Sequence, residues 1–196
     1  MRTLVECPNN VEHHGAAGWS GSLREEKGGV EIEIGADRPF ALHLLDASRF
    51  IATGPRCDGV LIADRGSAGL TCFLELKGAI DPDRADHPFE QIQGAIEHFA
   101  PAPHGPQAHG EEHHVAWRAG DDIPTAPRGR GRARAISVAP DHTVAGVVVV
   151  VRGGTRHPPR WLTIAGRTIF VAVIQKHGAR GRVTMKLDDV EAALGL

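Results

Sequence analysis

The chain has 196 residues, of which 41% are apolar and 23% charged, so it is long enough for one domain with a buried core. A formal net charge of −2 excludes a protein that is basic over its whole surface, and 5% aromatic residues argue against a platform that stacks single-stranded bases. The sequence shows no signal peptide, no run long enough for a membrane span and no C-x-x-C pair among its three Cys, which predicts a cytoplasmic protein.

The first quarter of the chain is expected to form an arm followed by short strands. Residues 1–28 are polar and weakly periodic, so we expect an N-terminal arm there, with a short helix around Leu23–Lys27 as the alternative. Val30–Ile34 alternates apolar and acidic residues, which predicts a half-exposed strand. Phe40–Leu45 fits either a strand or the start of a helix.

The next segment predicts a β-hairpin and an amphipathic helix. Val60–Ala63 and Leu70–Lys77 are β-rich runs on either side of a polar turn at residues 64–69. Apolar residues then recur at spacings of three, four and seven through Pro88–Phe99, which predicts a helix with one buried face. Proline near the start of this segment suits a first helical turn.

The remainder is expected to be a loop, a buried strand and three shorter elements. Residues 100–135 are rich in Pro, Gly, His and Arg, which predicts a long mobile loop. Val144–Val151 is a continuous β-branched run, as in a strand buried on both faces. Two further strands and a short terminal helix are predicted at Arg167–Ile174, Gly181–Met185 and Leu187–Leu194. The fold class expected from this order is α/β, with a mixed β-sheet flanked by helices.

Polar residues are expected to gather at one end of the hairpin. Glu75 and Lys77 point to the same face, because side chains alternate along a strand. If the turn is centred between Ser67 and Ala68, Asp58 lies opposite Lys77. Val60 then lies opposite Glu75. A register error of one residue would move these side chains to the opposite face.

This group offers the hard oxygen ligands that Mg²⁺ or Mn²⁺ prefers. The carboxylates of Asp58 and Glu75 and the main-chain carbonyl of Leu76 would be the ligands, with water filling the other positions. The Lys77 ammonium could orient an attacking water or stabilise a phosphodiester transition state. The competing interpretation is an exposed Glu75–Lys77 ion pair on an edge strand.

The arrangement resembles the PD-(D/E)XK nuclease superfamily, the restriction-endonuclease-like proteins. Asp58 is followed by Glu-Leu-Lys-Gly at 75–78 and then by a helix with Gln91, or with Gln93 as the competing choice. The resemblance implies that Asp58 and Glu75 bind metal, that Lys77 and Gln91 serve catalysis, and that the nuclease-like domain spans residues 29–196. Cys57 stands where the family motif has proline.

The resemblance also implies an additional acidic ligand, and this sequence does not single one out. The candidates are Glu25, Glu26, Glu31 and Glu33. Four alternating arginines in the predicted loop could track the phosphates of a nucleic acid, and these are Arg128, Arg130, Arg132 and Arg134.

The function that follows from the resemblance is Mg²⁺-dependent hydrolysis of phosphodiester bonds, in DNA rather than RNA, within restriction, defence or DNA processing. It implies a homodimer or an assembly with a partner protein. The alternative is a catalytically inactive nuclease-fold module that binds nucleic acid or a protein partner.

Overall fold

The computed structural model describes residues 11–25, 28–45, 55–65, 69–99, 143–152, 157–164 and 166–196. The strands are β1 (Val11–His13), β2 (Trp19–Glu25), β3 (Val30–Ala36), β4 (Phe40–Leu44), β5 (Gly59–Asp64), β6 (Gly69–Lys77), β7 (Thr143–Val150), β8 (Arg160–Ile164), β9 (Arg167–Gln175) and β10 (Arg182–Lys186). The helices are α1 (His87–Phe99) and α2 (Leu187–Ala193), with short 3₁₀ turns η1 (Gly15–Ala17), η2 (Pro82–Arg84) and η3 (Ala179–Gly181).

A six-stranded mixed sheet forms the centre of the fold, in the order β4-β5-β6-β7-β9-β8. Strands β4, β5 and β6 are antiparallel neighbours, and β7 and β9 then run parallel to β6. The predicted hairpin, the buried strand β7 and the helix α1 are confirmed. Strand β8 was not predicted; it is paired antiparallel with β9 and forms one edge of the sheet.

A second, four-stranded sheet has the order β1-β2-β3-β10. Here β3 pairs in parallel with β10, from the far end of the sequence, and antiparallel with β2. Residues 11–25 therefore contribute strands to this sheet, so the expected N-terminal arm is wrong over that range, as is a helix at residues 23–25. Leu23 is fully buried, which explains why this polar segment is held in place.

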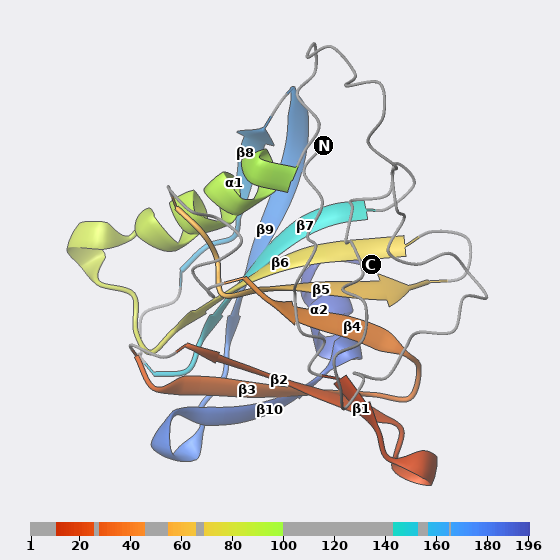
Figure 1. Ribbon diagram of the computed structural model, residues 1–196. Helices are drawn as coiled ribbons and strands as arrows, with labels where there is room; N and C mark the ends of the chain where they lie inside the picture. Colours follow the sequence, from red (N-terminus) through yellow and green to blue (C-terminus); the bar gives the residue numbers. More distant parts are fainter. Residues whose placement is uncertain are drawn as a thin grey trace.

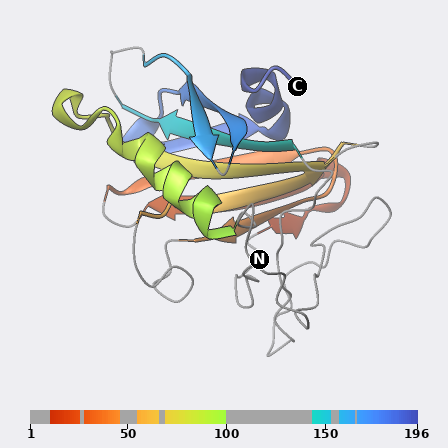
Figure 2. The same cartoon turned by 90° about the horizontal axis from the view of Figure 1, so that it is seen from above.

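The two sheets stack face to face, α1 covers the outer face of the six-stranded sheet, and α2 packs against strands of both sheets (Figures 1 and 2). One apolar cluster fills the space between the sheets and includes Ile32, Leu61 and Val147. A second lies between the six-stranded sheet and α1 and includes Phe73 and Ile92. The expectation of a mixed α/β fold is confirmed, but the single sheet is wrong, because a second sheet covers the face opposite α1.

The predicted loop at residues 100–135 lies outside the described residues. Within the part of the chain that the structure describes, no helix is both long enough and apolar enough to span a membrane.

Candidate functional site

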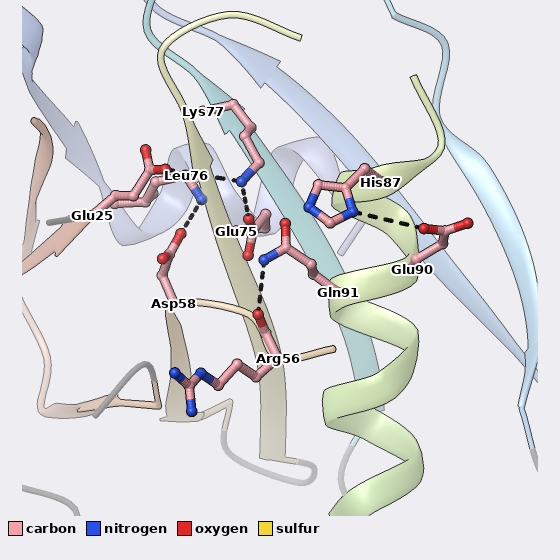
Figure 3. Close-up of polar contacts among 9 residues, drawn as sticks. All are labelled: Glu25, Arg56, Asp58, Glu75, Leu76, Lys77, His87, Glu90 and Gln91. Atoms are coloured by element: carbon pink, nitrogen blue, oxygen red, sulfur yellow. Dashed lines mark hydrogen bonds and ion pairs between the residues drawn. The ribbon is translucent and has the colours of Figure 1, made fainter. Parts of the chain in front are cut away.

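The candidate site lies where β6 ends beside the residues that precede β5 (Figure 3). Glu75 and Lys77 lie on β6 and point to the face of the sheet that α1 covers, together with Phe73 of the α1-facing cluster. Asp58 is the residue immediately before β5. The structure thus brings together the three side chains that the motif predicted, and α1 adds Gln91 beside them.

The hairpin register differs from the expected one by two residues. Gly59 pairs with Leu74 and Val60 pairs with Phe73, because the hairpin closes at the pair Asp64–Gly69. The predicted pairing of Val60 with Glu75 is therefore wrong. A shift of two residues keeps every side chain on its original face, so the predicted grouping survives the error.

Asp58 is anchored at the end of the hairpin by main-chain contacts. Its Oδ2 accepts a hydrogen bond of 2.6 Å from the Leu76 amide, and its carbonyl oxygen accepts one of 2.8 Å from the Leu45 amide. The residue is 5% exposed. The Asp58 side chain thus extends the hairpin pairing past the start of β5, and its position relative to β6 is fixed by the backbone.

The Leu76 carbonyl is directed toward the same side as Asp58. Lys77 uses its carbonyl oxygen to accept from the Val151 amide, which follows β7 on the other side of β6. The main-chain groups of successive strand residues face opposite edges, and the amide and carbonyl of one residue face the same edge. Since the Leu76 amide donates to Asp58, the Leu76 carbonyl also faces the Asp58 side.

Glu75 is a fully buried carboxyl group, with 0% of its surface exposed. Its Oε1 lies 2.5 Å from Nζ of Lys77, while its Oε2 has no hydrogen-bond partner among the described residues. Burial, and next the negative charge of Asp58, raise the pKa of Glu75 to about 9. Without a cation at this position the group therefore holds its proton at neutral pH.

Lys77 keeps its positive charge in this setting. Burial alone would lower its pKa, but the Glu75 carboxylate and its hydrogen bond outweigh burial and raise the pKa of Lys77. A second carboxyl group, Glu25, lies with its Oε1 4.0 Å from Nζ of Lys77. The ammonium is therefore placed between carboxyl groups from two different sheets.

Of the candidates for an additional acid that the structure describes, Glu25 is the one that reaches the site. Glu31 pairs with Arg182 at 3.1 Å, Glu33 is exposed on β3, and Glu26 lies outside the described residues. Glu25 ends β2 rather than lying on a helix. Its approach depends on how the two sheets stack, so no local sequence signal could have selected it.

The contacts of Gln91 and Gln93 show which of the two candidates faces the site. Gln93 donates to Glu97 along the exposed surface of α1, at 2.8 Å. Gln91 instead donates through Nε2 to the Arg56 carbonyl at 3.0 Å, and its Oε1 is buried without a partner among the described residues. Gln91 therefore holds the segment that leads into Asp58.

A tight helix contact supports the same segment and was missed by sequence reasoning. A Cβ atom built on Gly94 would lie 2.6 Å from the Pro55 carbonyl oxygen, which is closer than real Cβ contacts allow. The available signal was a glycine inside a helix, where it costs about 1 kcal/mol relative to alanine. The α1 face formed by Gln91 and Gly94 thus packs directly on the chain just before Asp58.

The donor atoms present suit a hard divalent cation held partly by water. Among the described residues no three His, Cys, Asp or Glu side chains form a ready ligand group. Magnesium ordinarily binds through one or two carboxylates and keeps several waters, so a complete protein cage is not required. The unpartnered Oε2 of Glu75, the Asp58 carboxylate and the Leu76 carbonyl form a set of that kind.

The predicted nucleic-acid contacts Arg128, Arg130, Arg132 and Arg134 lie outside the described residues. Comparisons of the chain with protein-family models, with curated proteins and with solved structures find no match in any of the three.

Proposed function

We propose that this chain is a metal-dependent nuclease of the restriction-endonuclease-like PD-(D/E)XK type, hydrolysing phosphodiester bonds in DNA in preference to RNA. The observation that carries the proposal is the buried Glu75 carboxyl group, which has one oxygen without a partner and lies beside Asp58 and Lys77. Burying a carboxyl group without full pairing costs free energy, and a cation would recover it.

The chain topology around the site supports the same proposal. An antiparallel run of three strands, β4, β5 and β6, is followed by α1 and then by β7 parallel to β6. The motif residues lie at the start of the middle strand and the end of the third strand. The hairpin, the helix and the buried strand on which the resemblance rests therefore pack against one another.

In this proposal Asp58, Glu75 and the Leu76 carbonyl hold Mg²⁺ or Mn²⁺. The bound ion would supply a nucleophilic water at neutral pH and neutralise charge on the phosphodiester. Lys77 keeps its proton and offers an ammonium that orients the attacking water and stabilises negative charge as it develops. Gln91 holds the Asp58 segment through the Arg56 carbonyl.

A cleavage assay on duplex DNA, single-stranded DNA and RNA tests the proposal. We expect the wild-type protein to cut in Mg²⁺ or Mn²⁺ and not in EDTA, and we expect Asp58→Asn, Glu75→Gln and Lys77→Met to abolish cutting. Glu33→Gln, on the exposed face of β3, is the matched control and should cut normally. Equal cutting by the wild type and all site variants would refute the proposal, whereas metal-dependent binding without any cutting would favour the inactive module.

A further inference from the structure

We propose that Arg152 and Arg180 form a phosphate-binding pair that contacts the sugar–phosphate backbone of DNA beside the candidate site. The inference rests on the proposed nuclease function, because it assigns the path of the substrate past the same strand ends. The predicted loop arginines lie outside the described residues and stay a separate prediction.

Arg152 follows β7 and lies directly beside the end of β6. The Val151 amide donates to the Lys77 carbonyl at 2.9 Å, and the Arg152 amide donates to the Gly78 carbonyl at 2.5 Å. These bonds continue the β6–β7 pairing past the last strand residues. The Arg152 side chain therefore begins next to the strand end that carries Lys77.

The Arg152 side chain reaches Gly181, the residue that follows Arg180 in the η3 turn. A Cβ atom built on Gly181 would lie 2.8 Å from Nη2 of Arg152 and 2.8 Å from the Gly29 carbonyl oxygen. The Gly29 amide in turn donates to the Glu25 carbonyl at 3.1 Å. The η3 turn that carries Arg180 thus adjoins Arg152 on one side and the end of β2 on the other, at the left of Figure 1 where β6 and β7 end.

The two guanidinium groups are exposed and lack acidic partners among the described residues, unlike several basic side chains around them. Arg182 pairs with Glu31, and Lys176 pairs with Asp189. Two exposed cations carried by adjoining segments attract a polyanion, and arginine binds phosphate oxygens through two parallel hydrogen bonds. A phosphodiester backbone presents such oxygens regardless of base sequence.

The backbone of Arg180 adds a second, independent indication. Its φ of 56° lies in the left-handed region, and it is the one non-glycine residue with positive φ among the described residues. This conformation costs free energy for an L-residue with a side chain, and glycine would adopt it freely. An arginine held there places its guanidinium at a cost in stability, which is a pattern found at functional positions.

Binding without cleavage tests the pair directly. In a Glu75→Gln background, the affinity for a fluorescent DNA duplex is measured in Mg²⁺ by anisotropy over a range of salt concentrations. We expect Arg152→Ala and Arg180→Ala each to lower the magnitude of the slope of log K against log salt by about one. Arg167→Ala is the matched control, because Arg167 is an exposed arginine at the start of β9, whereas the η3 turn with Arg180 follows the end of β9. The salt dependence of DNA binding should be the same in this variant as in the Glu75→Gln parent.

Arg180→Gly separates binding from folding. It removes the left-handed strain, so the Tm should rise by about 2–4 °C while the salt slope falls as in Arg180→Ala. Unchanged slopes in the Arg152 and Arg180 variants would overturn this inference even if the wild type cuts DNA. Reduced slopes in a protein that never cuts DNA would support the inference and refute the nuclease proposal.

Discussion

Replacing Glu75 by glutamine should make the metal-free protein more stable at neutral pH. The substitution keeps the shape of the side chain and removes its titration. In the folded protein the pKa of Glu75 is raised from 4.5 to about 9 by burial, and further by Asp58. Between these two pH values Glu75 is ionised in the unfolded chain and protonated in the folded protein. The free energy of unfolding therefore falls as the pH rises through that window.

The size of the effect follows from the same two values. A pH of 7 lies about 2.5 units above the ordinary carboxyl pKa of 4.5. Each of these units lowers the free energy of unfolding by about 1.36 kcal/mol. Wild type should therefore be about 3 kcal/mol less stable than Glu75→Gln at pH 7, and the difference should nearly vanish toward pH 4.5. This result would show that the wild-type site lowers the stability of the metal-free protein.

Urea unfolding in EDTA at several pH values between 5 and 8.5 measures this difference. Glu33→Gln is the control, since Glu33 is exposed and its substitution should leave the pH dependence unchanged. Adding Mg²⁺ at 100 times its dissociation constant should restore about 2.7 kcal/mol to the wild type and nothing to Glu75→Gln. A Glu75→Gln protein that is less stable than the wild type at pH 8, or a difference independent of pH, would refute the reasoning.

Three further predictions follow from the contacts around the site and at the opposite end of the sheet. The apparent affinity for Mn²⁺ should rise roughly tenfold per pH unit from pH 6 to 8, because Glu75 must lose a proton whose pKa is about 9; calorimetric titration would detect this rise, and a flat profile would contradict it. Gly94→Ala should cost about 1–3 kcal/mol in urea unfolding despite the better helix propensity of alanine, because its Cβ would meet the Pro55 carbonyl; a stabilised variant would show that α1 does not pack tightly there. Glu191→Gln should cost about 2 kcal/mol, because this buried α2 residue pairs with Arg38; unchanged stability would mean that the ion pair does not anchor α2.

The elements that could be predicted are those whose own sequence carries a strong pattern. The continuous valines of β7 indicate a strand that is covered on both faces, and the spaced apolar residues of α1 indicate a helix with one buried face. Strand β2 could not be predicted in this way, because its polar sequence contains one large aliphatic residue, Leu23, that the second sheet buries. Edge strand β8 alternates between exposed and half-buried positions and has only Ile164 fully covered.

The candidate site was predictable only in part for the same reason. Asp58, Glu75 and Lys77 could be grouped because alternation along β6 and hairpin pairing are local properties, and a register error of two residues did not change their face. The approach of Glu25, which ends β2, requires the stacking of the two sheets. Contacts between segments so distant in sequence leave no local periodic signal.

The central claim is that a divalent cation binds between Asp58 and Glu75. Crystals grown with Mn²⁺ and measured at the manganese absorption edge test it most directly. We expect an anomalous peak with oxygen ligands at about 2.0–2.6 Å, supplied by both carboxylates and by the Leu76 carbonyl. Density showing Lys77 still paired to Glu75, with no manganese peak there at saturating Mn²⁺, would contradict the account.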